Sequence, residues 1–300
     1  MVAAPPQVDE EALRSPGRSA GLLDVYRWRF LLKLLVRKEL RVRYRGSVLG
    51  LLWSYVKPGV QLLVFYVAMG KFLGLDRQQP NYIIYLFSGI VMVNFFSEVF
   101  NNTTRSIVLN ADLVKKIYLP RELFPVSSVW VAMVHLFPQL VVLVGASLVV
   151  GWRPGALNLL ACLGALVITT VAGLGLGLIF GAVNVLFRDA ENLVDLILMM
   201  ATWLSPVLYT WDKAYGVLHG NVLWWLYQVN PGTSAIELAH FGFWLPTRAV
   251  AAKYAGQTPL PAMPFHFGWW AVLGLSVSIV MVLSGQFVFR RLEGRFAQEL

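Results

Sequence analysis

Three long stretches without a charged residue limit what this chain can fold into. Residues 123–152, 154–187 and 254–289 contain no Asp, Glu, Lys or Arg over 30, 34 and 36 positions. A helix crosses the apolar core of a bilayer with roughly 20 residues, so each stretch is long enough to span a membrane. Charged residues make up only 14% of the 300 residues, against roughly 25% in soluble domains. A soluble fold is therefore excluded.

Hydrophobic patterning predicts six membrane-spanning segments. They cover about 50–73, 82–104, 128–150, 157–186, 192–210 and 267–289. Backbone groups cannot stay unpaired in lipid, and the alternating pattern of a β-barrel is absent, so the segments must be helices. We expect an all-α integral membrane protein with six transmembrane helices, an N-terminal amphipathic interface helix and short outer re-entrant helices.

The basic residues indicate the orientation of these helices. Cytoplasmic loops of membrane proteins carry an excess of Lys and Arg, and 18 of the 25 basic residues fall on one side of the predicted topology. These are Arg14, Arg18, Arg27, Arg29, Lys33, Arg37, Lys38, Arg41, Arg43, Arg45, Arg105, Lys115, Lys116, Arg121, Arg188, Arg290, Arg291 and Arg295. We therefore expect a multi-pass protein of the inner (plasma) membrane with both termini cytoplasmic. Topology accounts for the net charge of +9, so no nucleic-acid partner is expected.

The N-terminal part divides into a tail and a helix ahead of the six-span transmembrane domain at 46–300. Residues 1–24 are polar, lack the apolar core of a signal peptide and are expected to form a disordered cytoplasmic tail. Residues 25–45 predict an amphipathic helix lying in the cytoplasmic headgroup layer. One flank carries Lys33, Arg37, Arg41 and Arg45, and the other carries Trp28, Leu31, Leu32, Leu35 and Val42.

The pattern of this helix is imperfect, because Glu39 and Arg43 fall among its apolar positions. A plain polybasic anchor without a further role is the alternative interpretation.

A second short helix is predicted in the loop at 105–125. Asn110 is a good N-cap, and the Asp112 carboxylate suits the first turn of a helix that starts there. Leu113 and Ile117 share one face, with Lys115 and Lys116 at the rim, and such an element can dock into a partner's groove. The alternative is an ordinary loop helix.

The segment at 211–266 is apolar in places but too short there to span. Asn230 and Pro231 predict the N-cap and first turn of a helix that carries Glu237. Two half-buried helices that line an exit or dip into the outer leaflet fit this segment, and structural packing alone fits it equally well.

Several kinds of chemistry are missing from the sequence. There is no phosphate-binding loop of the type G-x-x-x-x-G-K-[ST], so this chain is not expected to bind ATP or Mg in that manner, nor any cofactor. The single cysteine, Cys162, and four scattered histidines predict no metal site. Ionisable residues inside or near the spans are functional hypotheses by default, although surface and core roles are open for each. They are Lys57, Glu98, His135, Glu191 and Asp195.

Small residues at intervals of four in the fourth span, namely Gly173, Gly177 and Gly181, predict close helix packing.

Four ordered motifs carry a family resemblance over residues 25–295. They are RKELRVRYRGSVLGLLW (37–53) leading into Lys57-Pro58, NADLVKKIYLPRELFP (110–125), NVLFRDAENLVDLILMMATWLSPVLY (184–209) and Asn230-Pro231. In this order they resemble the permease subunits of type-2 ABC exporters. The most similar branch exports polysaccharides and polyol phosphates (Wzm-type: O-antigen, capsule, teichoic acid and mycobacterial galactan).

The resemblance implies a homodimer of six-helix permeases joined to two copies of a separate nucleotide-binding ATPase subunit, which binds the ATP and Mg. The cargo it implies is a lipid-linked polysaccharide that passes between the two permeases. By position, residues 25–45 resemble the family's interface helix and 110–119 its coupling helix. Phe187-Arg188-Asp189 looks like its cytosolic turn, and Ser205-Pro206 its break in the fifth span.

Aromatic residues of the first two spans are similar in position to the family's channel aromatics, on which sugars are thought to stack. They are Phe65, Tyr66, Tyr85, Phe95 and Phe96. An interfacial belt or plain lipid contact is the alternative for each of them.

Two other functions stay open at this point. A membrane-embedded acyltransferase acting on a lipid-linked sugar needs a deep base and a nucleophile, and the sequence offers only His135. An ABC exporter permease for a drug or a small lipid keeps the architecture but changes the cargo. The short outer loops and the amphipathic 25–45 helix favour the glycan branch.

Overall fold

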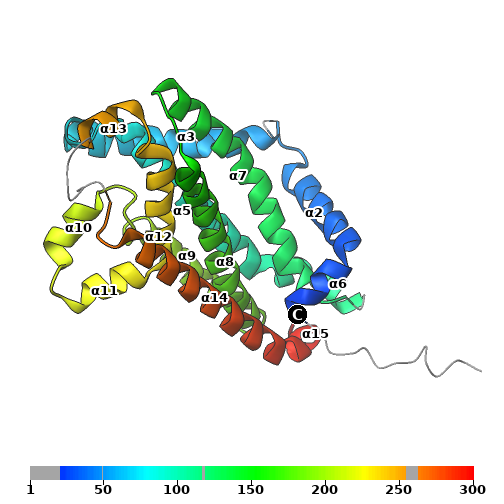
Figure 1. Cartoon of the computed structure of the whole chain (residues 1–300). Helices are drawn as coiled ribbons and strands as arrows, with labels where there is room; N and C mark the ends of the chain where they lie inside the picture. The colour runs from blue at the N-terminus through cyan, green and yellow to red at the C-terminus, as the bar shows by residue number, and fades with distance from the viewer. Residues whose placement is uncertain (1–20, 49, 117–118, 255–262) are drawn as a thin grey trace, which may run out of the picture.

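The protein is a bundle of helices in the computed structural model (Figure 1). The structure describes residues 21–48, 50–116, 119–254 and 263–300, and no strand occurs within these ranges, so the all-α prediction is confirmed. Most of the predicted tail, residues 1–20, lies outside the described residues. Gly21–Leu23, which the prediction placed in that tail, form a 3-10 helical turn.

Four helical stretches of the described residues are long and apolar enough to cross a membrane, rather than the predicted six. They are α5 (Tyr82–Leu109), α7 (Leu123–Val149), α8 (Ala156–Leu186) and the stretch Phe267–Glu299, most of which is α14 (Phe267–Leu292). The four correspond to the predicted second, third, fourth and sixth spans.

The predicted first and fifth spans are interrupted helices. The first begins with a 3-10 turn, Gly50–Leu52, continues as α3 (Trp53–Phe65) and then widens into a π-helix at Tyr66–Phe72. The fifth, α9, covers Ala190–Ala201 and then gives way to turns around Ser205-Pro206. Proline has no N–H for the helical ladder, which explains why α9 does not continue to residue 210.

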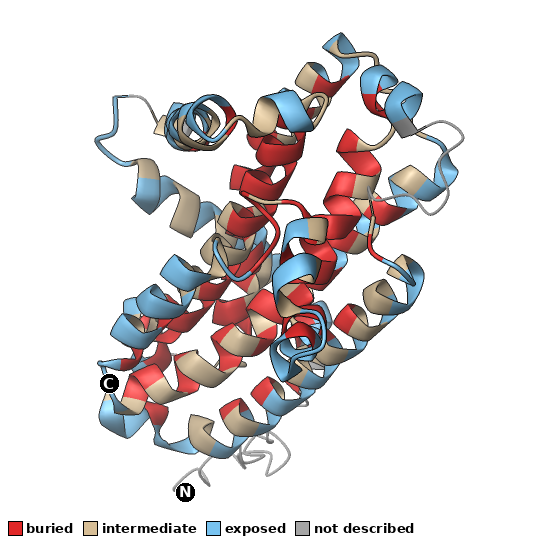
Figure 2. Ribbon diagram, turned by 90° about the vertical axis from the view of Figure 1, so that its left-hand side faces the viewer, coloured by how far each residue is buried: buried red, intermediate tan, exposed pale blue. Residues whose placement is uncertain are grey.

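Helix α5 lies at the centre of the bundle, between α7 and α8, and α8 in turn packs on α14. Figure 2 shows the buried residues concentrated along these central helices. The close packing predicted for the fourth span is confirmed. A Cβ on Gly173 would lie 2.8 Å from the Val99 side chain of α5, and one on Gly175 would lie 2.6 Å from the backbone of Met281 in α14. Glycine thus lets the three helices approach at these positions.

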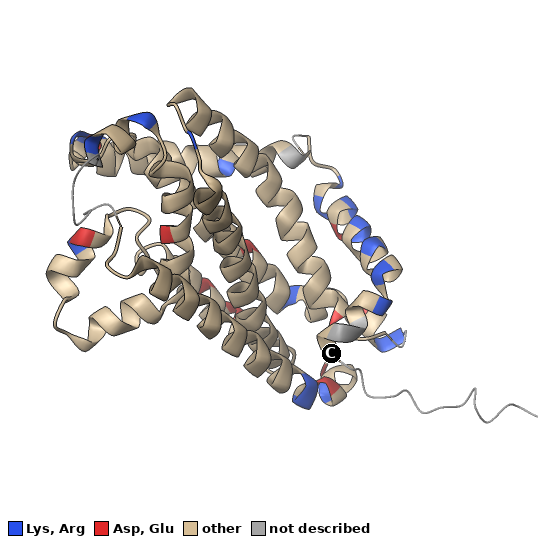
Figure 3. Cartoon of the chain, viewed as in Figure 1, with Lys and Arg blue, Asp and Glu red and all other residues tan. Residues whose placement is uncertain are grey.

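The N-terminal amphipathic helix is α2 (Arg29–Tyr44), which follows the single turn α1 (Asp24–Arg27) and packs along α7. Next to it, α6 (Ala111–Lys116), the 3-10 turn Glu293–Arg295 and α15 (Phe296–Glu299) close one end of the bundle. These elements are joined by an apolar cluster of side chains, and we call this cluster the end cluster. Its buried members are Val25, Leu35, Ile107, Val114, Leu123, Phe124, Leu178, Ala182, Val185, Phe289 and Phe296. Lys and Arg gather on α2 and at this end, while the long helices between carry almost no charge (Figure 3).

The opposite end is built from short helices. They are α4 (Leu75–Gln78), α10 (Trp211–Leu218), α11 (Val222–Val229), α12 (Pro231–Ala239), a π-helix at His240–Trp244 and α13 (Arg248–Tyr254). The predicted cap of α12 is confirmed, because the backbone N–H of Gly232 donates to Asn230 Oδ1 at 3.0 Å. Helix α12 was expected to be half-buried, and the structure differs from this expectation. Its residues are almost all buried, because it packs against α5, α8 and α14.

Candidate functional site

A polar cavity of about 780 Å³ opens among α2, α3, α5, α7 and α9. It lies toward the end of the bundle that carries α2 and is unusual for a membrane-embedded region, because most of its lining residues carry a side-chain group that can form hydrogen bonds. The lining residues are Arg43, Tyr44, Ser47, Trp53, Ser54, Lys57, Pro58, Gln61, Asn94, Ser97, Glu98, Asn101, Asn102, His135, Gln139 and Leu198.

Arg43, at the end of α2, connects three helices across this cavity. Its guanidinium donates to Glu98 Oε1 of α5 at 2.6 Å and to Asn102 Oδ1 at 2.9 Å. The same group lies 2.9 Å from Nδ1 of His135 on α7, whose ring also contacts the Glu98 carboxylate. A charged hydrogen bond of this geometry is stronger than a neutral one, so Arg43 joins α2 to both neighbours.

Amide side chains border the same cavity, and a second ion-pair group lies further along α5, outside its lining. Asn94 donates to Gln61 Oε1 at 2.9 Å, which links α5 to α3. Further along α5, Arg105 pairs with Glu191 at 3.2 Å and with Asp195 at 3.6 Å, which links α5 to the start of α9. The cavity walls are therefore held by polar contacts between helices.

Two more contacts fix α2 on the bundle. Ser127 and Ser128 of α7 donate weakly to the Glu39 carboxylate, at 3.5 and 3.4 Å, and burial raises the pKa of Glu39 above its usual range. Lys38 Nζ donates to Asn110 Oδ1 at 2.6 Å. Asn110 occupies the predicted N-cap position, because its backbone carbonyl accepts the first hydrogen bonds of α6. Its side chain makes other contacts: besides accepting from Lys38, its amide donates to the Ser106 carbonyl at the end of α5.

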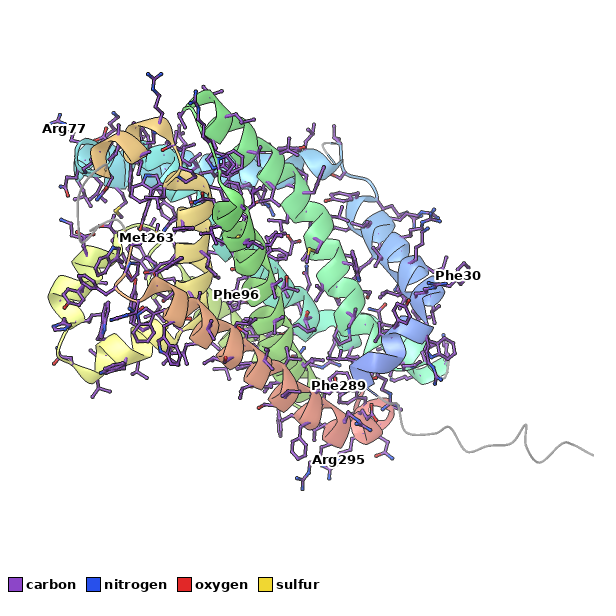
Figure 4. The ribbon with its side chains drawn as sticks, viewed as in Figure 1. Phe30, Arg77, Phe96, Met263, Phe289 and Arg295 are labelled. Carbon is purple, nitrogen blue, oxygen red and sulfur yellow. The ribbon has the colours of Figure 1, made fainter. Side chains whose placement is uncertain are left out.

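The predicted interface-helix residues lie mostly on the free face of α2. Lys33, Arg37, Arg41 and Arg45 are exposed, as the helical projection predicted. Trp28, which was placed on the apolar flank, is also exposed. Figure 4 shows the neighbouring Phe30 pointing away from the bundle. Leu31, Leu32 and Leu35 of the predicted apolar flank do make the apolar contact of α2: Leu35 belongs to the end cluster, and Leu31 and Leu32 pack against it.

The predicted channel aromatics separate into two groups. Tyr85 and Phe95 are buried inside the bundle, where the Tyr85 hydroxyl donates to the carbonyl of Tyr209 at 2.9 Å and its ring stacks on His240. Neither ring has a free face in this conformation. Phe65, Tyr66 and Phe96 are half-buried, so part of each ring is exposed.

Phe96 lies near the middle of the bundle (Figure 4) and borders a second, mainly apolar cavity of about 600 Å³. This cavity lies on another face of α5, where Met92 and Val93 also line it. Helix α5 therefore separates a polar cavity from an apolar one.

The predicted coupling residues lie around the end cluster. Asp112, Lys115 and Lys116 of α6 are exposed, whereas Leu113 is half-buried against the end cluster. Ile117 lies outside the described residues. Between α8 and α9, the residues Phe187, Arg188 and Asp189 are exposed, and the Phe187 side chain is 68% exposed. Leu109 at the end of α5 is 69% exposed. We call these exposed residues of α5, α6 and the α8–α9 turn the end surface.

The part of the chain that the structure describes holds no group of three or more His, Cys, Asp or Glu side chains placed to bind a metal ion. Glu98 and His135 are a pair, and their partner is the Arg43 guanidinium, which repels a cation. The polar cavity is thus suited to hydrogen bonding rather than to metal chemistry.

The arrangement of long apolar helices, a polar cavity between them and an exposed end surface fits a transport subunit, and comparison with known proteins decides the family. The model of the ABC-2 type transporter family matches residues 31–244. The chain belongs to the ABC-2 type transporter family. This ABC-2 match begins in α2 and ends with the π-helix after α12, so it includes the whole polar cavity.

Relatives of this ABC-2 chain are named as polysaccharide transporters. An O-antigen export system permease protein RfbA of Klebsiella pneumoniae is 30% identical over 208 residues, which are 65% of this chain and 78% of the relative. The protein of the same name from Myxococcus xanthus is 31% identical over 62% of this chain and 70% of its own length. The polysialic acid transport protein KpsM of Escherichia coli is 22% identical over 68% of this chain and 78% of its own length.

The amide side chains that line the cavity were not identified from the sequence, although the spacing of polar residues in α5 indicates some of them. Asn94, Ser97, Glu98 and Asn101 recur at intervals of three and four along α5, which puts them on one helical face. Such a polar stripe in an apolar ABC-2 helix marks a lining surface. Gln61 and Gln139 stand alone in their helices and carry no such signal.

Proposed function

We propose that this chain is the permease subunit of an ABC exporter that moves a lipid-linked polysaccharide across the plasma membrane, powered by a separate ATPase subunit. The observation that carries the proposal is the similarity to O-antigen export permeases over about two thirds of the chain. The polar cavity supports it, because a hydrophilic cargo needs hydrogen-bonding walls inside the membrane.

The working assembly is a homodimer of this permease with two copies of the nucleotide-binding subunit, which supplies the ATP and Mg site. The missing phosphate-binding loop supports this division of labour. The end surface is the docking site for the ATPase subunit, because it combines exposed apolar side chains such as Phe187 with Lys115 and Lys116 at its rim.

The chain crosses the membrane six times in this proposal. The interrupted helix at 53–72 has about 20 residues, or about 30 Å of rise, and serves as the first span. Helix α9 with the following turns serves as the fifth span. Both termini and α2 lie on the cytoplasmic side, where α2 rests in the headgroup layer with its basic face toward anionic lipids. Helices α10 to α13 lie outside, with α12 re-entrant.

The cargo passes between the two permeases along the half-buried rings Phe65, Tyr66 and Phe96. Aromatic faces suit the apolar faces of sugar rings and do not require one sugar sequence. The buried Tyr85 and Phe95 support the helices behind this path.

Depletion of the chain in its own host cell tests the proposal. We expect surface glycan to disappear and lipid-linked glycan to accumulate inside, because the polymer is still made but has no path across the membrane. Re-expression should restore export, and inactivating the ATPase subunit should reproduce the defect. Surface glycan that persists but lacks acyl groups would point to an acyltransferase, and unchanged glycan with altered drug sensitivity to a different cargo.

A further inference from the structure

The polar cavity holds buried hydrogen-bonding atoms that its own residues do not use. His135 and Gln139 of α7 are 5% and 6% exposed. Among the described residues, His135 Nε2 and Gln139 Oε1 have no hydrogen-bond partner. Both residues line the cavity. An unpaired buried polar atom is destabilising, so the two atoms indicate that a ligand or water pairs with them.

The other side chains define the chemistry of that ligand. Asn94, Gln61 and Asn101 carry amides, and Ser54 and Ser97 carry hydroxyls that line the same space. Each of these groups can both donate and accept a hydrogen bond. Sugar hydroxyls have the same double character, so an amide-lined wall suits a carbohydrate.

Charge decides against an anionic ligand. The Arg43 guanidinium, which faces the interior, already binds the Glu98 carboxylate and the Asn102 amide. A phosphate placed here would also meet the negative charge of Glu98. Lys57 also lines the cavity, but its side chain is exposed, whereas His135 and Gln139 are buried. Neutral hydroxyl groups therefore fit the buried part of this lining better than a phosphate does.

The size of the cavity and the aromatic residues at its border are suited to a saccharide. The cavity volume of about 780 Å³ falls within the range of about 300–1,000 Å³ that is usual for small-molecule sites. Trp53 and Tyr44 lie at its border and offer flat aromatic faces beside the polar wall. Planar polar groups with an aromatic platform provide contacts for both the edge and the face of a sugar ring.

We infer that the polar cavity is a saccharide-binding subsite that receives sugar units of the cargo through their hydroxyl groups before they reach the aromatic path. This inference rests on the proposed function and adds the position and chemistry of the first binding step. It assigns Gln139, His135, Asn94 and Gln61 to the cargo, and of these four only His135 was a candidate from the sequence.

Cysteine protection tests the inference on the complex of permease and ATPase subunit in lipid nanodiscs. A Ser97→Cys label site is introduced in a Cys162→Ala background, and its reaction with a maleimide is timed. The probe is the host strain's own glycan, released from its lipid by mild acid. We expect saturating glycan to slow labelling at least about fivefold, because a bound sugar covers position 97, whereas inorganic pyrophosphate has little effect.

The control site is Asn192→Cys, on an exposed position at the start of α9 outside the cavity, where glycan should leave the labelling rate unchanged. Gln139→Leu should raise the glycan concentration for half-protection about tenfold, as expected for one lost hydrogen bond of about 1–1.5 kcal/mol. The Asn192→Leu variant should not change it. Variants are compared only when their thermal unfolding midpoint matches that of the parent complex.

A labelling rate for Ser97→Cys that glycan does not slow, or equal protection by pyrophosphate, would overturn the inference. If depletion of the chain abolishes export in cells while the label site at position 97 is unprotected, the subsite fails and the proposed function stands. If export continues without the chain, the proposed function itself fails.

Discussion

We expect Phe187→Asp to weaken binding of the ATPase subunit by at least about a hundredfold and to abolish export. Phe187 is exposed at the C-terminal end of α8, beside the end cluster, and is the largest apolar side chain of the α8–α9 turn. If it fills a pocket of the partner, the substitution removes that contact and buries an unpaired carboxylate. A hundredfold loss corresponds to about 2.7 kcal/mol, which is within the range of hot-spot residues. Co-purification from membranes and surface glycan are the measurements.

Two variants make this result specific. Phe187→Leu keeps an apolar group and should lose far less binding, and Asn192→Asp adds the same charge at a nearby exposed position and should be mild. Leu113→Asp is a poorer test, because Leu113 packs on the chain's own end cluster and the change would destabilise the permease itself. If Phe187→Asp is normally inserted and still binds the ATPase at the parental level, the docking site lies elsewhere on the end surface.

Arg43→Met should lower both the thermal stability of the permease and export. The change leaves the Glu98 carboxylate and the His135 ring without their shared cation inside the cavity. Removing one partner of a fully buried ion pair costs about 3–5 kcal/mol. Here both side chains are partly exposed, at 38% and 24%, so about 1–2 kcal/mol is expected after solvent screening. The unfolding midpoint of the purified chain and glycan export are the readouts.

Arg41→Met, on the same helix but outside the cavity and its ion pair, is the matched control and should leave the midpoint unchanged. The double variant Arg43→Met, Glu98→Leu should recover much of the lost stability, because it removes the uncompensated carboxylate as well. Export should stay low in the double variant, since the cavity has lost its polar wall. A midpoint for Arg43→Met equal to that of Arg41→Met would show that the ion pair does not hold α2 on the bundle.

The four long helices could be predicted from the sequence, because segments of this length and apolar composition are typical of membrane-spanning helices. The same holds for the glycine face of α8, where close approach requires residues without a side chain. The cap at Asn230-Pro231 was also predictable, since the cap is set by local chemistry. These features depend on neighbouring residues or on one helix face.

Features that depend on contacts between distant segments could not be predicted. Glu39 and Arg43 break the amphipathic pattern of α2, and the structure shows that they make its polar contacts with the bundle. Asn110 is a residue type that often caps a helix with its side chain, but its side-chain oxygen accepts a hydrogen bond from Lys38, 72 positions away. Tyr85 looks like a channel aromatic in the sequence, and only tertiary packing buries it.

Reconstituted transport tests the central claim most directly. The permease and its ATPase subunit are placed in vesicles with the lipid-linked glycan of the host on the outer leaflet, the ATPase facing outward, and glycan reaching the lumen is measured as protection from an added glycosidase. We predict protection only with ATP, Mg and both subunits present, and none when either subunit is omitted. Protection that arises without the permease, or a complex that hydrolyses ATP but never protects the glycan, would contradict this assignment.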